Sequence, residues 1–86
     1  MTDKMYSHYV IVLDWAENDA EGVDIIAVKH TIEEAKEVFN EKLAEEKAYA
    51  IEREYEIYDE TDTSFDAGES GYYAASHTTL YIQGVI

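Results

Sequence analysis

The sequence predicts an α+β fold in which an antiparallel sheet of about four strands carries one helix on one face. Three observations predict this class. Two β-branched apolar runs lie near the N-terminus, a stretch with apolar residues at three- and four-residue spacing follows them, and strand-like patterns return toward the C-terminus. The 86 residues suffice for one modest core, so residues 1–86 are expected to form a single small acidic domain.

The first two expected strands form a hairpin. His8–Trp15, HYVIVLDW, contains a continuous apolar run that is typical of a central strand. Val23–Lys29, VDIIAVK, has the same character. Residues 16–22 between them have loop composition, and a short loop between two such runs predicts antiparallel pairing.

A helix is predicted to begin after Thr31. The segment Thr31-Ile32-Glu33-Glu34 matches a capping box, with Thr31 as the N-cap and Glu34 three residues later. Apolar residues then recur on one helical face: Ile32, Ala35, Val38, Phe39 and Leu43. The chain has no proline, so the helix is expected to continue to about Tyr49 or beyond.

The last part of the chain predicts two further strands, which gives the order β-β-α-β-β. Apolar residues alternate with glutamates over Ile51–Ile57, as in a half-exposed strand. Asp59–Gly71 is expected to be an acidic loop. The final strand is Thr78–Val85, TTLYIQGV, with additional pairing expected around Tyr72 and Tyr73.

Charge dominates the composition. The chain contains 20 Asp and Glu against 6 Lys and Arg, so its formal net charge is −14. Self-repulsion of this size opposes compaction, and it disfavours direct binding to nucleic acid or to an anionic membrane. The acidity is explained either by solubility alone or by a cationic partner. The absence of cysteine excludes disulfides and thiolate metal sites.

The candidate binding residues are carboxylates that repeat along two expected elements and the following loop. They are Glu34, Glu37, Glu41, Glu45, Glu52, Glu54, Glu56, Asp59, Glu60 and Asp62. The first four share a helical stripe with a rise of ~6 Å per four residues. The next three share one face of the expected strand, ~6.8 Å apart. Charges at these intervals resemble the phosphate spacing of a nucleic-acid strand, which predicts binding in a basic groove built for nucleic acid.

Other chemistry has weaker support. His8, His30 and His77 are the only histidines and would be the ligands of a metal site, but their spacing matches no metal motif. The oxygen-rich segment Asp59–Asp66 lacks the order of acids and the glycine of a calcium-binding loop. We therefore predict no catalytic residue, no metal and no cofactor, and a protein that is not an enzyme.

Three segments carry a resemblance to a known group. SHYVIVLDW (7–15), TIEEAKEVF (31–39) and GYYAASHTTLYI (71–82) resemble segments of small acidic proteins from phages and mobile elements of Gram-positive bacteria. That group implies no established activity and no catalytic residues. By size and acidity the chain is also similar in type to anti-restriction and anti-CRISPR proteins, several of which mimic DNA. Because the chain has no cysteine, no long apolar run and no secretion signal at residues 1–4, we expect it to be cytoplasmic, in a bacterial host cell. The charge pattern, together with this similarity of type, predicts a basic nucleic-acid-binding partner, such as a nuclease or a restriction or CRISPR effector.

Two alternatives remain beside the DNA-mimic hypothesis. In the first, the exposed sheet face and the tyrosines Tyr72, Tyr73 and Tyr81 form the interface of a phage or mobile-element assembly module, either monomeric or homodimeric. The acids then serve solubility only. In the second, His8, His30 or His77 supports an enzyme or a metal protein.

Overall fold

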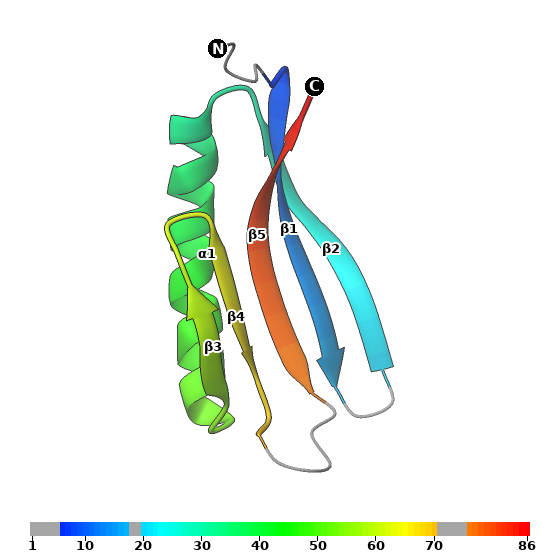
Figure 1. Ribbon diagram of the computed structural model, residues 1–86, viewed down its shortest axis with the longest axis vertical. Helices are drawn as coiled ribbons and strands as arrows, with labels where there is room; N and C mark the ends of the chain where they lie inside the picture. The colour runs from blue at the N-terminus through cyan, green and yellow to red at the C-terminus, as the bar shows by residue number, and fades with distance from the viewer. Residues whose placement is uncertain (1–5, 18–19, 71–75) are drawn as a thin grey trace.

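Strand β1 (His8–Glu17) lies inside a five-stranded antiparallel sheet in the computed structural model, which describes residues 6–17, 20–70 and 76–86 (Figure 1). The other elements are β2 (Ala20–Lys29), α1 (Ile32–Glu52), β3 (Glu56–Glu60), β4 (Ser64–Gly68) and β5 (His77–Val85). Helix α1 packs on one face of this sheet. The α+β class with one helix on an antiparallel sheet is confirmed, but three strands follow the helix and not two.

The strands are ordered β2-β1-β5-β4-β3 across the sheet. The N-terminal hairpin pairs β1 with β2, as predicted, and β1 also pairs with β5, so its central position is confirmed. Both hairpin strands are longer than predicted: β1 ends at Glu17, and β2 already begins at Ala20. The pairing expected around Tyr72 and Tyr73 falls outside the described residues.

The helix begins as its sequence predicts. Thr31 is the N-cap, and its Oγ1 accepts a hydrogen bond from the backbone N–H of Glu34 at 3.2 Å. The helix continues to Glu52 and ends where Glu54 adopts a positive φ of 59°. This left-handed residue turns the chain back, so that the N–H of Tyr55 bonds to the carbonyl of Ala50 at 2.8 Å.

Two sequence predictions after the helix are wrong. The strand expected over Ile51–Ile57 begins only at Glu56, because helical hydrogen bonding holds the chain through Glu52. The loop expected over Asp59–Gly71 contains the end of β3 and all of β4. In β4, the fully buried Phe65 and Ala67 alternate with half-exposed Ser64 and Asp66, which is a strand period inside an acidic, turn-rich composition.

The core lies between α1 and the sheet face that it covers. Phe39 of the helix packs with Ile11, Leu13, Phe65 and Leu80 from three adjacent strands. Burial of these side chains removes their apolar surface from water, which is the main term that holds the helix on the sheet.

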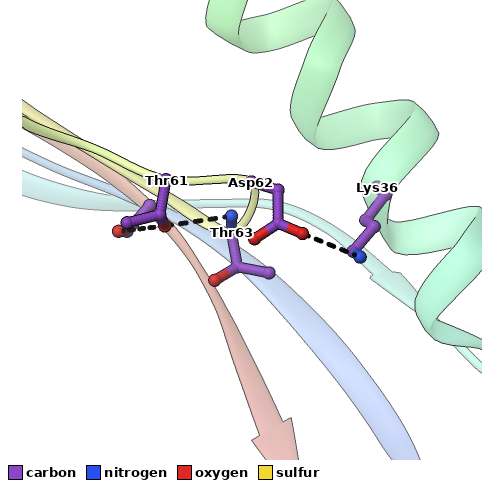
Figure 2. A network of polar contacts seen from close by, with 5 residues as sticks. Lys36, Thr61, Asp62 and Thr63 are labelled. Atoms are coloured by element: carbon purple, nitrogen blue, oxygen red, sulfur yellow. Dashed lines mark hydrogen bonds and ion pairs between the residues drawn. The ribbon is translucent and has the colours of Figure 1, made fainter.

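The β3–β4 hairpin is tied to the helix by ion pairs. Lys36 Nζ lies 3.2 Å from Asp62 Oδ2, and Lys47 Nζ lies 2.8 Å from Glu60 Oε2. Figure 2 shows Lys36 reaching from α1 toward Asp62 in the hairpin turn, where the Oγ1 of Thr61 accepts from the N–H of Thr63 at 3.2 Å. Two helix lysines therefore pair with acids of the β3–β4 hairpin, one at the end of β3 and one in the turn.

Candidate functional site

One face of α1 carries a row of exposed carboxylates, which we term the acidic helix face. Its members are Glu34, Glu37, Glu41, Glu45 and Glu52. All five side chains are exposed, while the buried residues of the helix, Ala35, Phe39, Glu46 and Ala50, lie on the side that contacts the sheet. Eighteen residues separate the first member from the last, so the row is ~27 Å long at ~1.5 Å per residue.

Glu52 joins this face because the helix is longer than the expected end. It stands seven residues after Glu45, which is close to two helical turns and places both on the same side. The sequence placed Glu52 on a strand with Glu54 and Glu56, and that grouping is wrong. Glu54 lies in the turn after the helix, and Glu56 begins β3 opposite Gly68.

The acidic helix face has few cations near it. Among the described residues, only Glu45 has an ion-pair partner, with its Oε1 3.6 Å from Lys42 Nζ. Lys36 and Lys47 pair with sheet acids, and Arg53 pairs with Glu17 at 2.7 Å. Apart from Lys42, the basic side chains of the helix and of its C-cap thus compensate acids elsewhere, and negative charge accumulates along one ordered row.

The remaining candidate acids do not extend this row as one face. Asp59 lies opposite Asp66 in the β3–β4 pair, and its Oδ2 accepts a hydrogen bond from Ser64 Oγ at 3.4 Å. Glu60 and Asp62 are the partners of the two helix lysines, so their charge is compensated within the molecule. Of the loop and strand candidates, only Glu54, Glu56 and Asp59 are exposed and lack an ion pair within the parts of the chain that are described.

The sheet face opposite the helix carries an uncovered apolar patch on the edge strand β2. Val23, Ile25 and Val28 are 62%, 59% and 53% exposed. In register they lie opposite Asp14, Val12 and Val10 of β1. The same face continues on β5 with Tyr81, which pairs with Val12. We term Val10, Val23, Ile25, Val28 and Tyr81 the open-face patch.

A cavity between helix and sheet was not foreseen from the sequence. Its volume is about 280 Å³, and its walls include Trp15, Glu17, Asp24, Glu46, Tyr49 and Thr78. The sequence does not predict Glu46 as a site residue, because it lies off the helical stripe of the candidate acids. It follows Phe39 by seven residues and Leu43 by three, a spacing that places it on the apolar side. We term this space the helix–sheet cavity.

Tyr49 closes one side of the cavity. Its hydroxyl donates a hydrogen bond to Glu17 Oε1, and the guanidinium of Arg53 lies 4.8 Å from its ring centroid. Burial raises the pKa of Tyr49 above its usual value, and the hydrogen bond to Glu17 raises it further. The phenol therefore remains protonated and acts as a donor at neutral pH.

The histidines do not form the metal site considered as an alternative. His8 lies opposite Val85 and His77 lies opposite Ala16, at the two ends of the β1–β5 pair. Eight residues of strand separate these positions, ~27 Å at ~3.4 Å per residue. A search of residues 6–17, 20–70 and 76–86 finds no group of three or more potential ligands placed to hold a metal ion.

Comparison with protein-family models, with curated proteins and with solved structures finds no match for this chain. In the part of the chain that the structure describes, no helix has the length and apolar character needed to cross a membrane.

Proposed function

We propose that the chain is an acidic binding protein that inhibits a nucleic-acid-binding defence protein by DNA mimicry, as several anti-restriction and anti-CRISPR proteins do. The observation that carries the proposal is the acidic helix face, where Glu34, Glu37, Glu41 and Glu52 have no ion-pair partner among the described residues. In this proposal a basic groove of the partner supplies the missing compensation.

The spacing of the charges supports a nucleic-acid groove as the target. Glu37, Glu41 and Glu45 follow one another at four-residue intervals, ~6 Å apart along the axis. A row of this kind attracts a cationic surface over a distance and raises the association rate at low ionic strength. The interaction is therefore expected to weaken as salt concentration rises.

Repulsion between neighbouring glutamates of the helix also supports a cationic partner. Like charges four residues apart in a helix cost roughly 0.2–0.5 kcal/mol per pair. Glu37–Glu41 and Glu41–Glu45 are two such pairs, and only Glu45 has a lysine nearby. A cationic partner would remove this repulsion on binding, so a feature that costs stability in the free protein contributes to affinity in the complex.

The experiment compares two double variants that change net charge equally. Glu37→Lys with Glu41→Lys reverses the middle of the acidic helix face. Glu21→Lys with Glu69→Lys makes the same change outside it, on β2 and after β4. Each immobilised protein is exposed to bacterial lysate and eluted with a salt gradient, and the eluted proteins are assayed for DNA cleavage with and without the free chain.

The wild type and the outside variant are expected to retain a nucleic-acid enzyme that elutes with salt, and the free chain is expected to inhibit it. The helix-face variant should neither retain this enzyme nor inhibit it. Equal loss in the two variants would show that only overall charge matters, and retention by the helix-face variant would refute mimicry by this surface.

A second candidate function follows from the open-face patch. Val23, Ile25 and Val28 expose more than half of their surface on an edge strand, an arrangement that suits pairing with another chain. On this hypothesis the chain is an interaction or assembly module, with a homodimer as its simplest form. Light scattering over a range of concentrations tests it: Ile25→Lys should abolish self-association, and a wild type that stays monomeric throughout would exclude the homodimer.

A further inference from the structure

The helix–sheet cavity is lined by both aromatic rings and carboxylates. Trp15 from β1 and Tyr49 from α1 line it together with Leu13, so much of its surface is apolar. Glu17, Asp24 and Glu46 contribute carboxylates from three different elements. This combination differs from the acidic helix face, because the cavity is a concave space and the helix face is a row on a convex surface.

Internal contacts hold two of the three carboxylates in place. Glu46 is buried, its Oε1 accepts from Thr78 Oγ1 at 2.7 Å, and its Oε2 lies 3.5 Å from Lys42 Nζ. Glu17 Oε1 accepts from the Tyr49 hydroxyl and from Arg53. Both groups are therefore fixed before any ligand arrives, which reduces the entropy that binding must overcome.

The third carboxylate, Asp24, has no ion pair with any cation in the part of the chain that the structure describes. Asp24 Oδ2 accepts a hydrogen bond from Trp15 Nε1 at 3.1 Å. Gly22 permits this arrangement, because a Cβ at that position would lie 2.8 Å from Trp15 Cζ2. The indole thus lies close to Gly22, with the Asp24 carboxylate at its Nε1.

We propose that the helix–sheet cavity binds a small organic cation, an ammonium or amidinium group on a short aromatic or aliphatic body. The cationic group would interact with Asp24, with the fixed carboxylates of Glu17 and Glu46 nearby. The apolar body would lie against Trp15 and Tyr49, whose π faces attract cations as well as apolar groups. The volume of about 280 Å³ accommodates a ligand of this size. The site is independent of the DNA-mimic proposal.

The only tryptophan of the chain is Trp15, so its fluorescence reports on the cavity directly. Benzylamine is the probe, and benzyl alcohol is an uncharged control of nearly the same shape. At about pH 8, where histidine is mostly neutral, benzylamine is expected to change Trp15 emission saturably, with a dissociation constant on the order of 1 mM. Benzyl alcohol is expected to bind about tenfold more weakly.

Variants assign the effect to the cavity. Asp24→Asn keeps an oxygen that can accept from the indole but removes the charge, and it should weaken benzylamine binding about tenfold. Glu46→Gln provides a second test from the opposite wall. Glu41→Gln removes the same charge on the exposed helix face and should leave binding unchanged. Circular dichroism confirms that each variant is folded.

The proposal is overturned by any of three results. The first is no saturable change with benzylamine in the folded wild type. The second is equal affinity for benzyl alcohol and benzylamine, which would show that charge is not recognised. The third is an equal effect of Glu41→Gln and Asp24→Asn, which would assign the attraction to the overall charge of −14 and not to the cavity.

Discussion

Thr78 Oγ1 donates a hydrogen bond to Glu46 Oε1 across 2.7 Å and so joins the helix to the sheet through two buried polar side chains. Thr78 lies on β5 opposite Trp15 of β1 and Ala67 of β4, on the face that the helix covers. A buried carboxylate is costly unless it is hydrogen-bonded. The Thr78 hydroxyl and the Lys42 ammonium meet this need from two directions.

Replacement of Thr78 by valine is therefore expected to destabilise the fold although the shape is nearly preserved. The variant leaves Glu46 Oε1 buried without its donor, which costs about 1–3 kcal/mol. Urea denaturation followed by circular dichroism measures the loss. Thr79→Val is the matched control, because Thr79 bonds to the half-exposed Asp66, which water can reach. An equal loss in both variants would contradict a special role for the buried bond.

The acidic helix face predicts that one substitution has opposite effects at two positions. Glu41→Lys replaces repulsion by attraction with Glu37 and Glu45, so the free energy of unfolding should rise by about 0.5 kcal/mol. Glu33→Lys makes the same charge change in the first turn, where the helix dipole favours acids, and should lower it by about 0.3–1 kcal/mol. Thermal unfolding at low ionic strength compares them, and added salt should reduce both differences.

The Glu41→Lys variant also separates the effect on stability from the effect on partner binding. If the proposed function is correct, Glu41→Lys binds its partner more weakly although it is the more stable protein. A parallel fall of stability and binding in Glu41→Lys would instead indicate that the substitution disturbs the fold.

The N-cap of the helix gives a third prediction. Thr31→Ala removes the acceptor for the Glu34 N–H and should cost about 1 kcal/mol. Thr31→Asp retains a cap acceptor and adds a charge that the helix N-terminus favours, so it should preserve or increase stability. Chemical denaturation of the two variants under the same conditions makes the comparison, and equal destabilisation would show that the cap bond is not significant.

The start of the fold was predictable from local signals. The capping box at Thr31 and the apolar run from Val10 to Leu13 gave the helix start and the central strand, because each depends on neighbouring residues only. The end of the helix was not predictable in the same way. Glu52 and Glu54 fit a strand alternation as well as a helix, and the choice depends on the left-handed turn at Glu54.

Strand β4 and the helix–sheet cavity show a further limit. Asp66 and the surrounding polar residues give the segment the composition of a loop, and only the burial of Phe65 and Ala67 against the helix makes it a strand. The cavity unites Trp15, Asp24 and Glu46 from three elements, so it depends on the assembled topology. The four helix acids of the candidate site were predictable by contrast. Their three- and four-residue spacing alone places them on one face of a helix.

The last prediction concerns alkaline pH and Tyr49. Its pKa is raised in the folded protein by burial first and by the hydrogen bond to Glu17 second. A tyrosine is neutral when protonated, so a raised folded pKa means that the native state holds the proton more tightly than the unfolded chain. This contribution to stability is complete below the unfolded pKa of about 10 and is lost as pH rises through and beyond it.

The free energy of unfolding is therefore expected to fall more steeply with pH above about 10 in the wild type than in Tyr49→Phe. Tyr58→Phe is the control, since Tyr58 is 52% exposed and its hydroxyl bonds to the carbonyl oxygen of Glu69. Urea denaturation at closely spaced alkaline pH values measures how the free energy of unfolding changes with pH in the wild type and in each variant. A slope in Tyr49→Phe that equals the wild-type slope would refute the assignment, because the Tyr49 phenol would then release its proton equally readily in the folded and unfolded states.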